Sequence, residues 1–146
     1  MLANDYPDQV CSVARALEVV GERWTLLILR DVFAGLHRFD EMVDNLGIAR
    51  TILTSRLRKL VEDGVLERRR FEYHATEKGR ALFPVIAHLM RWGDTYYPEP
   101  AGPPRLLLHR NCGGQLQPAL ICQRCDQPAS ADQVEPVDGP ALAHHR

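Results

Sequence analysis

The sequence lacks the features of a membrane protein, a secreted protein or a common enzyme. It has no run of 18 apolar residues, and residues 1–10 contain no basic region followed by an apolar segment. We therefore expect neither a membrane span nor a secretory signal. It also has no P-loop, no dinucleotide-binding glycine motif and no Ser-His-Asp order. We expect a cytoplasmic protein that is not an enzyme.

Cysteine and net charge are also scarce. The 146 residues include 4 cysteines, too few for a disulfide scaffold, and three of them lie near the C-terminus. In a reducing compartment this clustering favours metal binding over disulfides. The net charge is −1 at pH 7, and 45% of the residues are apolar. The length allows one domain, or one small domain with an appendage.

Positive charge is concentrated in one stretch. Residues 1–49 carry 4 basic and 8 acidic side chains, a net charge of −4, whereas residues 50–80 carry 9 basic and 5 acidic, a net charge of +4. A nearly neutral protein with one basic stretch can present a surface to phosphates. The alternative interpretation is an ordinary solvated helix face.

The basic stretch begins in a predicted pair of short amphipathic helices. The first helix spans residues 38–46 and ends at Gly47, and the second spans 49–62 and ends before Gly64. Two such helices joined by a short turn containing glycine indicate a helix-turn-helix. The 3.6-residue period leaves a small, hydroxylated and basic face of the second helix in solvent, which suits the major groove of DNA. This face consists of Arg50, Thr51, Thr54, Ser55 and Arg58.

Two predicted strands follow, at residues 65–70 and 71–76. Such a hairpin after the second helix is typical of a wing, and Arg68, Arg69 and Arg70 at its outer end suit DNA phosphates. No Gly, Asn, Asp or Pro lies between the strands to form the turn. Either the hairpin is closed by unfavourable residues, or residues are missing between Arg70 and Phe71. We predict the second case.

Flanking helices complete the predicted N-terminal domain. Ser12 is expected to cap a first helix, and the apolar stretch 23–34 should form a second, buried helix. Thr76 is expected to cap a last helix, which Pro84 should kink. This last helix has more large apolar side chains than a small domain can bury, so we expect a subunit interface. Its apolar residues are Leu82, Phe83, Val85, Ile86, Leu89, Met90 and Trp92.

A proline-rich linker, 98–104, separates this domain (1–97) from a second group of chemically active residues. His109-x2-Cys112 and Cys122-x2-Cys125 are two pairs with the spacing of zinc knuckles, and together they would form a closed tetrahedral Cys3His site for structural Zn²⁺. The alternatives are a Cys122–Cys125 redox pair with a bystander His109, or inert thiols. We assign the zinc module to 105–131 and a frayed tail to 132–146.

The order of motifs resembles the HxlR-type winged-helix regulators, which are related to the MarR group. The resemblance covers about residues 11–92 and departs from the family at the wing, which is longer there. The matching residues are Cys11, Gly21–Trp24, Leu26–Arg30, Arg38–Met42, Leu57–Leu60, Asp63–Leu66, Glu72–Tyr73, Thr76–Gly79 and Trp92–Gly93.

The resemblance implies a mainly helical, winged helix-turn-helix homodimer that binds a pseudo-palindromic operator on double-stranded DNA, more often as a repressor. Carried onto this sequence, the base-contacting residues are those of the exposed helix face listed above. Arg38 would lie near phosphate and Phe39 in the core. With the wing arginines and Lys78, the predicted DNA-binding set is Arg38, Arg50, Thr51, Thr54, Ser55, Arg58, Arg68, Arg69, Arg70 and Lys78.

Cys11, the scattered histidines and the overall function each allow more than one interpretation. In some family members a cysteine at the position of Cys11 senses oxidants, which makes it a candidate redox sensor, but a partly buried structural thiol is the alternative. His37, His74 and His88 share no spacing, and we expect no metal ligand among them. A different function remains as the alternative to DNA binding: a winged-helix scaffold that binds protein or RNA through the zinc module. A dithiol oxidoreductase that uses Cys122 and Cys125 is a third.

Overall fold

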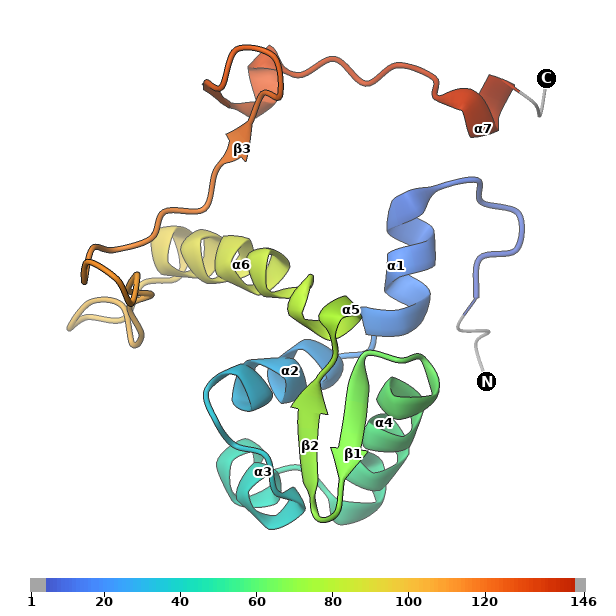
Figure 1. The fold of residues 1–146 in the computed structure, drawn as a ribbon, viewed down its shortest axis with the longest axis vertical. Coiled ribbons are helices and arrows are strands. Elements are labelled where there is room, and N and C mark those ends of the chain that lie inside the picture. The colour runs from blue at the N-terminus through green and yellow to red at the C-terminus, as the bar shows by residue number, and fades with distance from the viewer. Residues whose placement is uncertain (1–4, 144–146) are drawn as a thin grey trace. The chain divides into compact units, whose positions relative to one another are not determined.

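The computed structural model describes residues 5–143. The chain divides into two compact units, one that ends at Phe83 and one that begins at Pro84. Each unit is described separately (Figure 1).

None of the helices within residues 5–143 is both long and apolar enough to cross a membrane.

The first unit is helical with one antiparallel hairpin, as the sequence predicts. Both helices of the helix-turn-helix lie within one residue of their predicted bounds. Gly47 ends the first of them in the left-handed region, with φ 63°. The elements are α1 (Ser12–Val20), α2 (Thr25–Phe33), α3 (Phe39–Leu46), α4 (Arg50–Glu62), β1 (Leu66–Arg69), β2 (Glu72–Ala75) and α5 (Glu77–Arg80).

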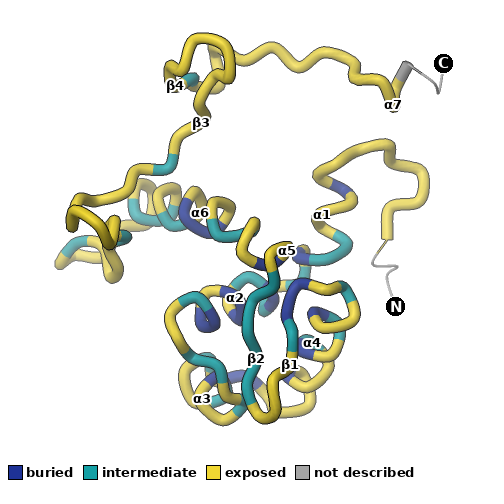
Figure 2. The backbone as a smooth tube through the Cα atoms, in the orientation of Figure 1, coloured by how far each residue is buried: buried dark blue, intermediate teal, exposed yellow. Residues whose placement is uncertain are grey.

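The core of this unit lies where α2, α3, α4 and β1 meet, and Figure 2 shows the buried residues gathered there. Burying a large apolar side chain contributes about 1.5–3 kcal/mol, so this core fixes the orientation of α4 relative to the hairpin. The large apolar side chains that are less than 2% exposed are Ile28, Leu29, Met42, Leu53, Leu57, Leu60, Leu66 and Val65.

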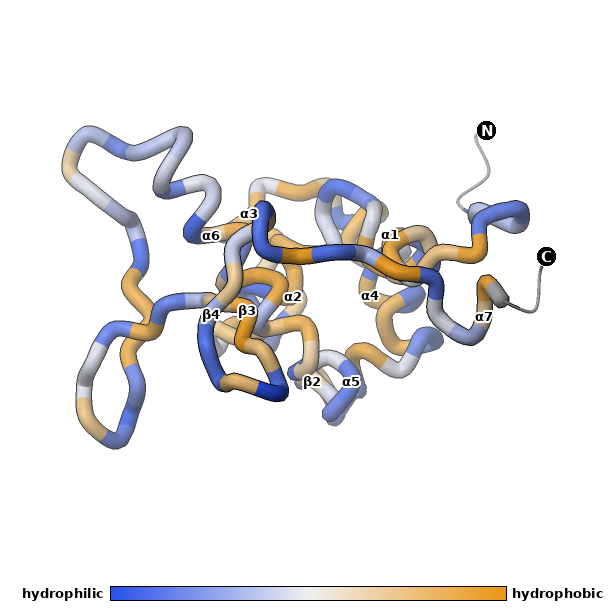
Figure 3. The backbone as a smooth tube through the Cα atoms, turned by 90° about the horizontal axis from the view of Figure 1, so that it is seen from above, coloured by the Kyte–Doolittle hydropathy of each residue, from blue (hydrophilic) through white to orange (hydrophobic). Residues whose placement is uncertain are grey.

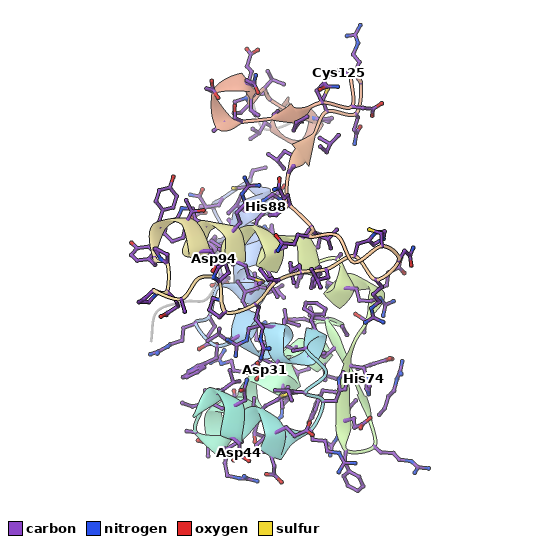
Figure 4. All side chains as sticks on the ribbon, turned by 90° about the vertical axis from the view of Figure 1, so that its left-hand side faces the viewer. Asp31, Asp44, His74, His88, Asp94 and Cys125 are labelled. Atoms are coloured by element: carbon purple, nitrogen blue, oxygen red, sulfur yellow. The ribbon has the colours of Figure 1, made fainter. Side chains whose placement is uncertain are left out.

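One buried carboxylate joins two of the core helices. Asp31 on α2 is 1% exposed and accepts hydrogen bonds from Arg30 at 2.8 Å and from the Nδ2 amide of Asn45 on α3 at 2.9 Å (Figure 4). A buried charge is tolerated only when it is paired and hydrogen-bonded, so these contacts hold α3 against α2.

The hairpin corrects the prediction of missing residues. β1 and β2 pair in antiparallel register from Leu66 opposite Ala75 to Arg69 opposite Glu72, so Arg70 and Phe71 alone form the turn. Arg70 takes the positive φ that a two-residue turn requires, 57°. The prediction of a gap was wrong. The wing is short and is closed by residues that are poorly suited to a tight turn.

Two predicted helix starts also change. Cys11 rather than Ser12 is the N-cap of α1, and it makes no side-chain capping bond. Thr76 caps α5 as predicted, because its hydroxyl accepts from the Gly79 N–H at 3.1 Å. The predicted kinked helix is instead two helices. Pro84 lies in the first turn of the second one, where a missing N–H costs nothing.

The second unit contains most of a long helix and two small hairpins. Its elements are α6 (Phe83–Tyr96), β3 (Leu120–Ile121), β4 (Pro128–Ala129), the 3-10 turn Ala131–Gln133 and α7 (Pro140–Ala143). The segment predicted as a frayed tail thus contains two short helical turns. Its last residues, 144–146, lie outside the described part of the chain.

Candidate nucleic-acid interface

The exposed face of α4 forms an open depression in the surface of the first unit. The depression has a volume of about 450 Å³, and its lining includes all five residues that the helical period assigned to this face. Their side chains are exposed because Leu53, Leu57 and Leu60 turn the opposite face of α4 into the core. The lining residues are Phe39, Arg50, Thr51, Thr54, Ser55 and Arg58.

Two basic side chains of this face differ in their surroundings. The guanidinium of Arg50 pairs with the Asp40 carboxylate at 2.9 Å and lies 4.9 Å from the ring centre of Phe39. The prediction that Phe39 lies in the core was wrong, because its half-buried ring lines the surface beside Arg50. Within residues 5–143, no ion pair involves Arg58, so its charge is available to a ligand.

A second depression, of about 620 Å³, lies against the wing. It shares Phe39 and Thr54 with the first depression, so the two adjoin. The two depressions together form one continuous surface that runs from α4 to the wing tip, where Phe71 is 77% exposed. Its lining residues are Arg38, Phe39, Asp40, Glu41, Thr54, Arg68, Phe71 and Tyr73.

The wing arginines are exposed and partly held by neighbours. Arg68 donates from Nε to the carbonyl of Arg70 at 3.0 Å and lies over the Tyr73 ring. Arg69 forms an ion pair with Glu67 on the same strand. Both side chains remain exposed, so they are accessible to a phosphate backbone.

The remaining two predicted contacts are placed differently. Arg38 is exposed and lies 4.0 Å from Glu72, at the edge of the second depression. Lys78, in contrast, donates from Nζ to the carbonyl of Asp63 at 2.7 Å. Lys78 therefore satisfies the C-terminal end of α4, and neither depression is lined by it.

Two histidines connect the wing to the segment that precedes α3. The rings of His37 and His74 stack with centroids 4.1 Å apart, and His37 Nδ1 lies 2.9 Å from the Tyr73 carbonyl. His74 Nε2 lies 3.0 Å from a Glu72 oxygen, and this hydrogen bond, with the positive charge of His74 and Arg38, lowers the pKa of the Glu72 carboxyl. No metal ligand was expected at these histidines. Their contacts give them a structural role.

Cys11 is exposed at the start of α1. Further along this helix, Glu18 accepts from the Tyr6 N–H at 2.9 Å and pairs with Arg15 at 2.6 Å. The Tyr6 hydrogen bond, more than the Arg15 charge, lowers the pKa of the Glu18 carboxyl. These contacts fold the segment before α1 back onto the helix.

Two helices, one in each unit, present apolar side chains to solvent. Val13 and Leu17 of α1 are 66% and 43% exposed, and Leu89 and Trp92 of α6 are 50% and 56% exposed. In contrast, Ile86 is buried, and Phe83 packs edge-on against Phe33. Of the apolar side chains that were predicted to exceed what the domain can bury, Val85, Leu89 and Trp92 are therefore exposed, whereas Ile86 is not.

The predicted zinc ligands form two separate pairs. The Cys112 sulfur lies 3.4 Å from His109 Nδ1, and Cys122 and Cys125 flank one turn, with Cys125 near the hairpin tip (Figure 4). Backbone N–H donation from Cys125, then from Arg124, lowers the pKa of the Cys122 thiol. Across residues 5–143, no three His, Cys, Asp or Glu side chains lie close enough together to hold one metal ion.

Sequence reasoning missed two features of the interface. It treated Phe39 as core and did not consider Asp40, yet these two residues hold Arg50. The signal was available: Asp40 lies in the first turn of α3, which precedes α4 by one short turn. Phe71 was treated as a strand residue, although a two-residue hairpin would have placed it at the tip.

Comparison with known proteins gives consistent matches. A family model described as HxlR-like helix-turn-helix matches residues 19–101. A Mycobacterium tuberculosis protein named as the uncharacterized HTH-type transcriptional regulator Rv3095 is 52% identical over 138 residues, covering 90% of this chain and 87% of that protein. The 90% coverage exceeds the span of the family model, so the similarity extends into the C-terminal part.

Solved structures match in the same way. The crystal structure of PA1607, described as a candidate transcription factor, is 37% identical with a TM-score of 0.79 and covers 90% of this chain and 97% of that chain. The quinone-bound structure of YodB from B. subtilis is 31% identical with a TM-score of 0.53 and covers 57% of this chain and 97% of that chain.

Proposed function

The chain belongs to the HxlR-like helix-turn-helix family and is a transcriptional regulator with a helix-turn-helix DNA-binding domain, and we propose that it represses transcription as a homodimer on a pseudo-palindromic operator. In this proposal α4 enters the major groove of double-stranded DNA. Arg50, Thr51, Thr54, Ser55 and Arg58 contact base edges. Arg38 and Arg68–Arg70 contact the phosphates.

One observation carries the DNA-reading part of the proposal. The five side chains chosen from the helical period all line one open depression. The exposed carboxylate beside them, Asp40, forms an ion pair with Arg50. Because the wing is short, we propose phosphate contacts for it and no minor-groove contact. Lys78 is proposed to support α4 through the Asp63 carbonyl rather than to bind DNA.

The homodimer is supported by the apolar side chains that α1 and α6 leave in solvent. Exposed apolar patches of this kind on a regulator favour a protein interface, and a two-fold dimer would match an operator made of two half-sites. The residues that we propose for the interface are Val13, Leu17, Val85, Leu89 and Trp92.

Two measurements test this proposal. Sedimentation at micromolar concentration should give a species of twice the 16.5 kDa chain mass, and Leu89→Asp should shift it toward the monomer. Footprinting on the region upstream of its own gene should give an inverted repeat with half-site centres about 10 base pairs apart, or a multiple of that spacing. A stable wild-type monomer, or a preference for RNA over duplex DNA, would refute the proposal.

Cys11 is proposed as a redox-sensitive position, supported by its exposure at the start of α1 and by the quinone-bound structure of the relative YodB. Treatment with a quinone should weaken DNA binding of the wild type and leave Cys11→Ser unaffected. Cys122→Ser is the matched control and should respond like the wild type. Equal responses of all three proteins would reject this role.

We also propose that residues 105–131 form a module that binds one structural Zn²⁺ through His109, Cys112, Cys122 and Cys125.

A further inference from the structure

The two ligand pairs lie in two copies of the same backbone turn, thirteen positions apart in the sequence. In the first copy the His109 N–H donates to the Gly114 carbonyl at 2.8 Å. In the second the Cys122 N–H donates to the Gln127 carbonyl at 2.9 Å. Each bond joins the first ligand to the residue five positions later. The two turns therefore close with the same register.

The inner geometry of the two turns also agrees. The Gly113 N–H donates to the His109 carbonyl at 2.7 Å, and the Asp126 N–H donates to the Cys122 carbonyl at 2.9 Å. The residue after the second ligand has positive φ in both cases, 73° at Gly113 and 58° at Asp126. Asp is among the non-glycine residues found most often in this conformation, so Asp126 can take the place in the second turn that Gly113 takes in the first.

The strands that lead into the two turns pair in matching positions. Leu108 bridges to Gln115 just outside the first turn, and Ile121 pairs with Pro128 just outside the second. The sulfurs receive backbone N–H donation: Gly114 to Cys112 at 3.4 Å, and Arg124 and Cys125 to Cys122. Such donation is suited to a thiolate that ligates a metal.

A second observation is independent of the ligands. The apolar side chains beside both turns are exposed, and neighbouring exposed apolar side chains often mark a surface that another part covers. Figure 3 shows the apolar stretch at β3. These residues are Leu108 at 53%, Leu116 at 49%, Leu120 at 62% and Ile121 at 55% exposed. Leu108 and Ile121 occupy equivalent positions in the two hairpins, and Leu116 and Leu120 each lie one residue further from the turn. Successive strand residues face opposite sides, so hairpins that met face to face would cover one of these two pairs.

We propose that the two hairpins are a duplicated zinc knuckle, and that they close on one Zn²⁺ with a Cys3His ligand set and bury Leu116 and Leu120 between them. This inference rests on the zinc module proposed above and not on DNA binding. Segment 117–119, which links the hairpins, is the hinge. Three thiolates and one neutral imidazole around Zn²⁺ leave one negative charge, and Arg110 and Arg124, within the two turns, offset it.

The ligand set is tested with Co²⁺ in place of Zn²⁺ in the full-length protein. The expected result is one ion per chain, with the intense visible bands of tetrahedral Co²⁺ and a thiolate charge-transfer band. Cys112→Ser and Cys122→Ser should each reduce that band and lower the affinity. His109→Cys should keep the tetrahedral bands and strengthen the charge-transfer band. Cys11→Ser is the matched control and should leave the spectrum unchanged.

An unchanged spectrum in Cys112→Ser or in His109→Cys would overturn the four-ligand set. No tetrahedral spectrum, with a Cys122–Cys125 disulfide forming instead, would overturn the zinc module itself. Neither result would bear on DNA binding, which is measured separately on duplex DNA.

Closure of the hairpins is tested by trypsin, because Arg110 and Arg124 lie within the turns. Zn²⁺ should slow cleavage at both sites at least tenfold. Leu120→Ser keeps all four ligands and should lower this protection and the zinc affinity together, whereas the exposed Val137→Ser, outside the module, should change neither. Zinc bound with unprotected arginines would refute closure while leaving the zinc module in place.

Discussion

The carboxylate of Asp40, at the start of α3, lies 2.9 Å from the guanidinium of Arg50, at the start of α4. This ion pair spans the turn of the helix-turn-helix, and it places a negative charge beside the surface proposed to meet DNA. Both side chains are well exposed, at 78% and 64%, so the pair contributes little to stability. We expect the pair to affect the affinity for DNA instead.

Asp40→Asn should therefore tighten DNA binding. Removing the carboxylate frees Arg50 and removes repulsion toward phosphate, so we expect a gain of about 0.5–1 kcal/mol at low salt that shrinks as salt is added. Fluorescence anisotropy with a labelled operator measures this gain. Asp44→Asn on the same helix, outside both depressions, is the control and should have a smaller effect. Weaker binding by Asp40→Asn would instead mean that Asp40 positions Arg50 for contact.

Arg70→Gly should stabilise the fold. Arg70 has φ 57° in the wing turn, a conformation that costs an L-residue about 1 kcal/mol and glycine almost nothing. Urea unfolding should give an increase of about that size. Arg69→Gly removes the same charge from a paired strand position and should destabilise the protein. A loss of stability in both variants would show that the contacts of the Arg70 side chain stabilise the fold by more than its positive φ costs.

Gly79→Ala should destabilise the first unit. A Cβ atom at this position would lie 2.1 Å from the Val65 carbonyl oxygen, which belongs to the backbone and cannot rotate away. We expect a loss of about 1–3 kcal/mol, as for other overpacked sites. Gly93→Ala is the control, because nothing lies within 4 Å of its added Cβ. In a helix this change should be neutral or stabilise by roughly 0.5–1 kcal/mol.

Glu72 should make stability depend on acid pH. The His74 hydrogen bond lowers the folded-state pKa of Glu72, so its contribution is present above the ordinary Glu pKa and is lost as pH falls through the folded value. Glu72→Gln should lower the free energy of unfolding at neutral pH and have a smaller effect at about pH 3.5. Glu62→Gln on α4 is the comparison. An equal loss at both pH values would exclude the carboxylate charge as the cause.

Local rules predicted much of this protein from sequence. The helical period assigned the exposed face of α4 because Leu53, Leu57 and Leu60 must face one core, and the same residues line one depression. The caps at Gly47 and Thr76 follow from residue type alone. Pro84 was misplaced because periodicity cannot distinguish a kinked helix from two helices.

Relations across the fold were harder to predict. The Asp40–Arg50 pair and the His37–His74 stack depend on how separate elements pack, which no single window of sequence contains. The wing turn was mistaken because turn rules describe preference, whereas strand pairing between Leu66 and Ala75 compels Arg70 into a disfavoured conformation. The match between the two C-terminal turns extends to backbone bonds that the ligand spacing alone did not specify.

The central claim, that α4 reads DNA sequence while the wing binds phosphate, is tested by comparing Arg58→Ala with Arg69→Ala on the operator and on a scrambled duplex over a range of salt. Arg58→Ala should lose about 1–3 kcal/mol on the operator and little on the scrambled duplex. Arg69→Ala should weaken binding to both duplexes equally and reduce the salt slope by about 1. If both variants weaken both duplexes to the same extent, α4 does not read sequence and the account is wrong.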